Sequence, residues 1–129
     1  MTYVADTHVL FWFLTNSRRL GSRARRILSA AELGTVKVYV PVIALAELQF
    51  ILEREHSRHS LSDFLVKLDA SEGFEVVDMT RNHVERLRAL GAIPEMHDRL
   101  IVALTLEQDA KLLTADAAIE DSHLVDVVW

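Results

Sequence analysis

Short apolar runs alternate with amphipathic stretches along almost the whole chain. Five runs have the apolar or β-branched character of strands: 2–5 (TYVA), 36–40 (VKVYV), 74–78 (FEVVD), 111–115 (KLLTA) and 124–128 (LVDVV). Helical patterns lie between them, at 7–14, 22–33, 42–54, 60–69, 80–90 and 95–108, with a short helical turn after residue 116. Strands that alternate with helices predict an α/β fold with a parallel sheet that helices cover on both faces.

Capping and helix-breaking residues place several of the predicted ends. Thr7 is expected to cap the first helix, because a hydroxyl oxygen can accept a hydrogen bond from the first turn. Gly34 and Gly91 each follow a helical pattern, and Gly34 has the position that favours a left-handed C-cap. Pro41 ends the second strand and can occupy the first turn of the next helix, while Pro94 opens a later helix.

The composition fits one domain, and residues 1–129 are expected to form it. Half of the 129 residues are hydrophobic, which is enough for a single core. The chain has no cysteine, so disulfides and thiolate zinc sites are excluded. No apolar run approaches the length of about 20 residues that spans a bilayer, and the start MTYVAD does not resemble a signal peptide. We therefore expect a cytoplasmic protein without a membrane segment. Its formal net charge of −5 argues against a protein that coats nucleic acid.

Four acidic residues lie in apolar surroundings near predicted strand ends. Asp6 follows the first strand, Asp116 follows the strand at 111–115, Asp98 lies in the first turns of its helix, and Glu47 lies one to two turns into the helix after the second strand. Ligands of parallel sheets bind beyond the carboxyl ends of the strands, so all four are expected at one edge. Carboxylates held together repel one another unless one of them takes up a proton or a cation binds. Oxygen donors without histidine or cysteine suit Mg²⁺ or Mn²⁺.

Each acid taken alone also has a structural explanation. Asp6 and Asp116 could stabilise helix N-termini through the helix dipole. Asp98 could pair with Arg99, and Glu47 could have a buried arginine partner. The convergence of four acids on one edge favours the metal site.

Five arginines and no acid lie between residues 18 and 26: Arg18, Arg19, Arg23, Arg25 and Arg26. One interpretation is the solvated face of a helix. The other is a contact with RNA phosphates, which the forked guanidinium group matches, or with an acidic partner. We assign the contact with RNA or a partner to Arg18, Arg19, Arg23 and Arg26.

The adjacent aromatic residues Phe11, Trp12 and Phe13 cannot all face one side of a helix. At least one is therefore expected to stay exposed unless a partner subunit covers it. Core packing, a subunit interface and base stacking remain open. His8 and His97 lie close in sequence to the predicted acids and are candidates for contacts around the site.

Four stretches resemble the acidic motifs of PIN domains, and among these most closely the VapC-type toxins of type II toxin–antitoxin systems. They are VADTHVLFWFL (4–14), ALAEL (44–48), EMHDRLIVA (95–103) and LLTADAAI (112–119). The resemblance covers essentially the whole chain and implies a three-layer α/β/α domain with a central parallel sheet. Asp6, Glu47, Asp98 and Asp116 match the acidic metal-site positions. Thr114 and Thr7 match positions that support the site.

The resemblance also implies a function. It implies an endoribonuclease that depends on Mg²⁺ or Mn²⁺, in which a metal-activated water hydrolyses RNA phosphodiester bonds. The implied partners are RNA, a cognate VapB-type antitoxin and a second copy in a homodimer. Residues 51–65 do not match the family pattern closely, so the partner's identity stays open.

Three other functions are alternatives to this one. A housekeeping PIN nuclease would share the site, and a catalytically inactive PIN-like binding module would not need all four acids. A phosphoryl-accepting receiver domain would need a lysine after a late strand, but Lys111 stands at the start of one.

Overall fold

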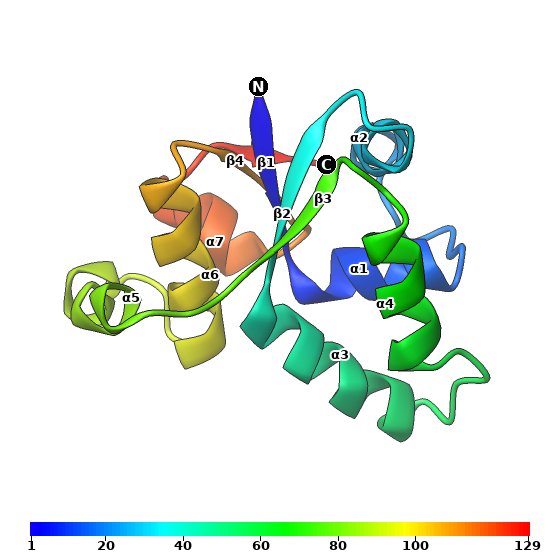
Figure 1. The fold of residues 1–129 in the computed structure, drawn as a ribbon. Helices are drawn as coiled ribbons and strands as arrows, with labels where there is room; N and C mark the ends of the chain where they lie inside the picture. Colours follow the sequence, from blue (N-terminus) through cyan, green and yellow to red (C-terminus); the bar gives the residue numbers. More distant parts are fainter.

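The structure is a computed structural model that describes residues 1–129, and a parallel sheet forms its centre (Figure 1). The strands are β1 (Thr2–Ala5), β2 (Lys37–Pro41), β3 (Phe74–Val77), β4 (Lys111–Leu113) and β5 (Val127–Val128). All pairs are parallel, in the order β3-β2-β1-β4-β5. The predicted parallel sheet is confirmed. Strand order reverses at β1, whose carboxyl end lies between those of β2 and β4.

Helices lie on both sides of this sheet, so the predicted α/β/α architecture is confirmed. Their bounds are α1 Thr7–Leu14, α2 Ser22–Glu32, α3 Val42–Arg54, α4 Leu61–Asp69, α5 Arg81–Glu85, the 3₁₀ helix η1 Leu87–Leu90, α6 Met96–Glu107 and α7 Ala117–Ser122. Figure 1 shows α1, α2 and α4 on one side, α5 and α6 on the other, and α3 beyond the carboxyl end of β2. None of these helices is long and apolar enough to cross a bilayer.

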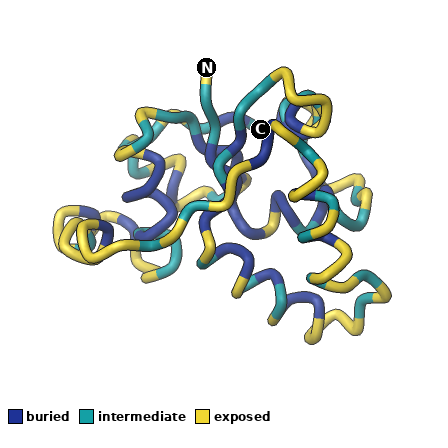
Figure 2. Tube along the Cα trace, viewed as in Figure 1, coloured by how far each residue is buried: buried dark blue, intermediate teal, exposed yellow.

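The core lies between the central strands and the helices that cover them. Val4, Ala5, Leu112 and Leu113 are fully buried in β1 and β4. Residues 100–105 of α6 are also buried, and Figure 2 shows the buried colour concentrated in the interior of the molecule. Because both faces of β1 and β4 are covered, their carboxyl ends are held rigidly.

Several local predictions are wrong, and the strand expected at 111–115 ends at Leu113. The helix expected at 80–90 divides into α5 and the 3₁₀ helix η1. The last strand shrinks to two residues, Val127 and Val128, which pair with Leu112 and Leu113 of the short strand β4. Asp6, and not Thr7, caps α1, since the Asp6 carboxylate accepts the Thr7 N–H while the Thr7 hydroxyl is drawn to another side chain.

The expectation that one of the three adjacent aromatics stays exposed is also wrong. Trp12 and Phe13 are only 9% and 8% exposed, and Phe11 is half-buried against the core. The reason is that α1 is covered on more than one side. The Trp129 ring packs edge-on to Trp12 at 5.7 Å, and Phe74 lies 6.4 Å from Phe13. The aromatic cluster is therefore core of the single chain.

Gly73 marks a close crossing of three segments. A Cβ atom at this buried residue would lie 2.2 Å from the Ala31 carbonyl oxygen and 2.5 Å from that of Val36. Its own carbonyl accepts a hydrogen bond from Val38 N at 2.7 Å. Only a residue without a side chain fits between the end of α2 and the start of β2.

His83 ties α5 to α6. The Thr80 N–H donates to His83 Nδ1 at 2.8 Å, which places the ring proton on Nε2, and Nε2 then donates to Glu107 Oε2 at 2.5 Å. The imidazole is almost fully buried. Both of its nitrogens are therefore used in holding the two helices together.

We expect His83→Ala to lower the free energy of unfolding by about 2 kcal/mol, because it leaves a buried space and strips the Thr80 N–H and Glu107 of their partner. Urea unfolding followed by circular dichroism measures the change. Glu85→Ala on the same helix is the control, because it removes only an exposed ion pair with Arg81, and a change below about 0.5 kcal/mol is expected. Equal effects of the two substitutions would contradict the predicted role of His83.

Candidate active site

The four predicted acids meet at the carboxyl edge of the sheet, where the strand order reverses. Asp6 directly follows β1, and Asp116 follows its neighbour β4. Glu47 comes from α3 and Asp98 from the first turn of α6. Their charges act on one another, since Asp6, Asp116 and Glu47 each raise the pKa of Asp98. The predicted convergence is thus present in the structure.

Asp6 is the most deeply placed of the four. It is 8% exposed, and both of its oxygens accept hydrogen bonds: Oδ1 from Thr7 N at 2.7 Å and Oδ2 from the Thr114 hydroxyl at 2.6 Å. Burial raises the pKa of Asp6, and these two hydrogen bonds oppose the rise. The orientation of the carboxylate is therefore fixed before any ligand binds.

Thr114 joins the ends of β1 and β4. Its Oγ1 accepts a hydrogen bond from Asp116 N at 3.0 Å, so its proton is free to go to Asp6. Asp116 Oδ1 accepts from Ile119 N at 3.1 Å and caps α7. One buried hydroxyl thus sets the positions of two acids relative to each other.

Glu47 is half-buried and has no arginine partner. The Thr7 hydroxyl donates to its Oε1 at 2.9 Å, and His97 Nδ1 lies 3.5 Å from its Oε2. Burial raises the pKa of Glu47, while Thr7 and His97 lower it. Thr7 therefore links the helix after β1 to the acid on α3.

Asp98 has a strongly raised pKa. Burial is the largest cause of the rise of its pKa to about 7, and the charges of the neighbouring acids add to it. Arg99, the suggested partner, instead donates to the carbonyl oxygens of Ile93 and Leu87 at 2.5 and 3.3 Å. No arginine neutralises Asp98, and the like-charge conflict expected from the sequence is present.

A fifth acid, Glu95, was missed by the sequence analysis. It caps α6, since Oε2 accepts from Asp98 N at 2.9 Å, and its Oε1 lies 2.6 Å from His97 Nδ1. Burial raises its pKa, but the hydrogen bonds from Asp98 and His97 outweigh burial and lower it overall. The sequence contains a signal for this cap. Glu95 directly follows Pro94 and stands three residues before Asp98, which is the spacing between an N-cap and the backbone N–H that it accepts.

The donor set fits a hard divalent cation held by few protein ligands. No three acidic or histidine side chains form a closed ligand set in the structure. Mg²⁺ usually keeps several waters and needs only one or two carboxylates together with substrate oxygens. The crowded acids Asp6, Glu47 and Asp98, all with raised pKa values, are the groups whose repulsion such a cation would relieve.

Two cavities flank the acids and share His8. The first, which we call the arginine cavity, has about 210 Å³ and is lined by Asp6, His8, Val9, Trp12, Arg19, Ala115 and Asp116. The second, of about 420 Å³, is lined by His8, Ile43, Ala46, Glu47, Phe50, Ile51, Arg54 and His97. The acids therefore border open space on both sides of His8.

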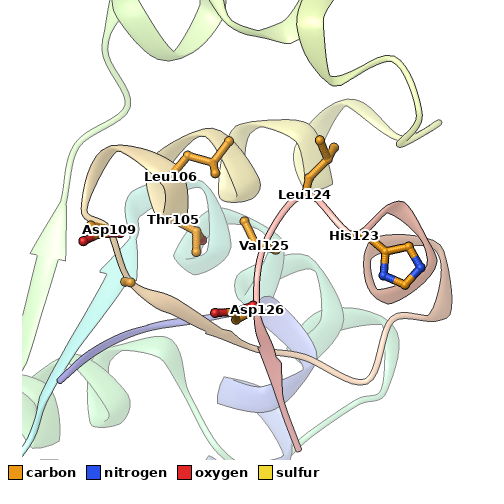
Figure 3. A pocket seen from close by; sticks show the side chains of 8 residues that line it. Thr105, Leu106, Asp109, His123, Leu124, Val125 and Asp126 are labelled. Carbon is orange, nitrogen blue, oxygen red and sulfur yellow. The ribbon is translucent and has the colours of Figure 1, made fainter.

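Another cavity lies at the opposite edge of the sheet and contains none of the predicted site residues (Figure 3). Thr105 and Leu106 of α6 line it together with residues just before β4 and β5. It has about 190 Å³. Its place at the amino ends of the strands separates it from the acids.

The arginine run divides in the structure. Arg25 donates to Asn16 Oδ1 and to the Ser17 carbonyl, at 2.8 and 2.6 Å. Arg19 lies over the Trp12 ring and lines the arginine cavity. The remaining arginines are exposed and form no ion pair: Arg18, Arg23 and Arg26. Only Arg19 among the predicted contacts borders the acids.

A parallel α/β domain with acids at the reversal of strand order defines the class of this protein. The family model for the PIN domain matches residues 3–122. The chain therefore belongs to the PIN domain family, as its four motifs suggested.

Solved structures show the same fold at low sequence identity. A toxin–antitoxin complex from Klebsiella pneumoniae is 19% identical, with a TM-score of 0.70 and coverage of 98% of this chain and 96% of that chain. VapBC2 from Rickettsia felis, bound to a DNA fragment from its promoter, is 18% identical, with a TM-score of 0.67 and coverage of 99% and 98%. VapC20 from Mycobacterium tuberculosis, a toxin that cleaves the Sarcin-Ricin loop, is 14% identical, with a TM-score of 0.71 and coverage of 98% of both chains. A search of curated proteins gives no match.

Proposed function

We propose that this PIN domain is an endoribonuclease that depends on Mg²⁺ or Mn²⁺ and serves as the toxin of a type II toxin–antitoxin system. The observation that carries the proposal is the meeting of four acids at one edge without a neutralising arginine or lysine. The pKa of Asp98, about 7, indicates that the fold keeps this carboxylate buried beside other acids although their charges repel it. Perturbed acids in a cleft are typical of functional sites.

Asp6 and Asp98 are the residues we expect to hold the metal, with Asp116 and Glu47 acting directly or through its waters. A bound ion would supply an activated water and neutralise charge on the phosphate. Thr114 keeps Asp6 oriented by its hydrogen bond at 2.6 Å. Glu47 keeps a carboxylate of raised pKa beside this edge, which suits it to accept a proton from the attacking water.

The structural neighbours support an antitoxin as one of the proposed partners. Those include a toxin–antitoxin complex, VapBC2, and a toxin that cleaves the Sarcin-Ricin loop. By analogy we propose a VapB-type antitoxin for this chain. The homodimer is proposed from the resemblance to the VapC-type toxins alone. A small adjacent gene for a DNA-binding protein would favour the toxin over a housekeeping PIN nuclease.

The direct test is cleavage of a mixed RNA pool with Mg²⁺, with Mn²⁺ and with EDTA. We expect cleavage with either metal and none with EDTA, and sequencing of the products names the target RNA. Activity that persists in EDTA would overturn the metal dependence. Absence of cleavage under all conditions would favour the binding module instead.

We expect Thr114→Val to lower the cleavage rate about 10- to 100-fold, because residues that orient metal ligands typically contribute this much. Valine keeps the shape of threonine but leaves Asp6 and Asp116 N without their shared partner. Thr114→Ser keeps the hydroxyl and is expected to retain most of the activity. Rates measured with saturating Mg²⁺ compare the two variants, and similar rates for both would contradict the orienting role.

A further inference from the structure

Arg19 is the only arginine or lysine that lines the arginine cavity, which it shares with Asp6 and Asp116. Its guanidinium carbon lies 4.9 Å from the centroid of the Trp12 ring. The guanidinium group forms no ion pair and donates no hydrogen bond, since the only bond from this residue is its backbone N–H to Ser17 Oγ. A free set of five N–H donors therefore borders a cavity whose other charged groups are acids.

The aromatic support under Arg19 is fixed by the rest of the chain. Trp12 is 9% exposed, and Trp129 packs edge-on against it at 5.7 Å. Trp129 in turn lies against Gly21, where a Cβ atom would come within 2.7 Å of it. Because Trp12 cannot swing away, its face offers Arg19 a stable cation–π contact.

Arg25 holds the loop that carries Arg19. Two of its guanidinium nitrogens donate to Asn16 Oδ1 and to the Ser17 carbonyl oxygen, within the segment between α1 and α2. The Ser17 hydroxyl oxygen then accepts the Arg19 N–H at 3.1 Å. One arginine of the run thus holds the loop in place, and a second is presented beside the acids.

We infer that Arg19 binds a phosphate of the RNA strand next to the phosphate that is cleaved. The inference rests on the proposed function, and it names the residue that draws the substrate toward an acidic site. Four carboxylates repel a phosphodiester strand, so a cation on the path of the strand offsets part of the repulsion. A guanidinium fork matches two phosphate oxygens at once.

The size of the arginine cavity agrees with this ligand. Its volume of about 210 Å³ equals the share of about seven water molecules in the liquid. A phosphate group with part of its sugar fits that space. A carboxylate of a protein partner is the competing ligand, and the test below separates the two.

The test uses the chain's own fluorescence, because its two tryptophans, Trp12 and Trp129, both lie in this cluster. A single-stranded RNA oligonucleotide is titrated with Mg²⁺ at several KCl concentrations into Asp98→Asn protein, which keeps the RNA intact. Arg19→Gln in that background is expected to weaken binding about tenfold or more, since it removes a charged hydrogen-bond donor. It should also reduce the slope of log K against log salt by about 0.7, the value for one phosphate contact on a single strand.

Arg88→Gln on η1 is the control, because it removes an exposed arginine of equal charge away from the acids. Equal affinities and salt slopes for Arg19→Gln and Arg88→Gln would overturn the inference. Weaker binding with an unchanged slope would also overturn it, because that result indicates packing on Trp12 alone. An acidic peptide that binds through Arg19 while the oligonucleotide does not would assign the site to a protein partner.

Kinetics separate this inference from the proposed function. With the acids intact, Arg19→Gln should raise KM for RNA more than it lowers kcat. If the wild-type protein shows no metal-dependent cleavage, the proposed function is refuted. The phosphate contact is not refuted by that result, because the salt dependence of binding measures it independently. Normal cleavage with an unchanged KM in Arg19→Gln would refute the phosphate contact alone.

Discussion

Asp98→Asn is expected to lower the rate of RNA cleavage by about 10²-fold or more and at the same time to stabilise the metal-free protein. The loss follows because the amide removes a charge from the proposed metal site. The gain follows because burial, and after it the charges of the neighbouring acids, raise the pKa of Asp98 to about 7 and so disfavour its charged form. Asparagine has nearly the same shape and carries no charge to repel.

The pH dependence of the stability follows from the direction of this shift. The pKa of Asp98 rises from 3.8 in its ordinary state to about 7 in the folded chain. Between these values the folded chain holds a proton that the unfolded chain has lost, so stability falls as pH rises. Above pH 7 the full penalty is present. Because Asp98 is partly exposed and solvent screens its charge, we expect its ionisation to lower the free energy of unfolding by about 1–2 kcal/mol.

Thermal unfolding in EDTA at pH 5 and pH 8 measures this effect. Wild type should lose more stability between the two pH values than Asp98→Asn, whose melting temperature at pH 8 should be a few degrees higher. Asp78→Asn is a matched control, since Asp78 also follows a strand, β3, but is exposed. Added Mg²⁺ should stabilise wild type and not Asp98→Asn. A variant less stable than wild type in EDTA at pH 8 would contradict the predicted repulsion.

Gly73→Ala is expected to lower the free energy of unfolding by about 3 kcal/mol or more. The new methyl group would meet the carbonyl oxygens of Ala31 and Val36 and the Cα of Ala31, all within 2.6 Å. These are backbone atoms, so no side chain can turn aside. The clash can be relieved only if the end of α2 moves away from Gly73, the residue before β3. That movement would strain the pairing of β2 with β3.

Gly91→Ala is the control for this change. A Cβ at Gly91 meets nothing closer than the Arg88 carbonyl oxygen at 3.7 Å, and its φ of −62° suits alanine. Urea denaturation should show little change or a slight gain for Gly91→Ala. If both glycine variants unfold at the same urea concentration, the crossing at Gly73 is looser than the structure indicates.

The sequence predicted the features that depend on local pattern. The β-branched runs predicted the strands, and the order of strands and helices predicted the parallel sheet. Asp6 and Asp116 could be placed because each directly follows a strand, and position after a strand determines the edge of the sheet. Gly34 was predicted correctly for the same local reason, since its left-handed φ of +77° ends α2.

The features that the sequence did not predict depend on contacts between distant segments. Trp12 is buried because Trp129, at the other end of the chain, packs on it. The hydroxyl of Thr7 bonds Glu47, forty residues away, so its predicted capping role passes to Asp6. The arginine run looked uniform, and only the folded loop distinguishes Arg19 from its neighbours.

Asp6 and Asp116 are helix caps as well as proposed metal-site acids. Their presence in a chain is therefore weaker evidence of activity than the presence of Glu47 or Asp98. Both carboxylates accept backbone N–H groups at the starts of α1 and α7, so the fold needs an oxygen at these positions even in a chain that cleaves nothing. Glu47 and Asp98 cap no helix, and the raised pKa of each means that folding disfavours its charged form. In related chains, an inactive descendant could therefore keep the first two acids indefinitely. Loss of Glu47 or Asp98 would be the earlier and more reliable mark that catalysis had been abandoned.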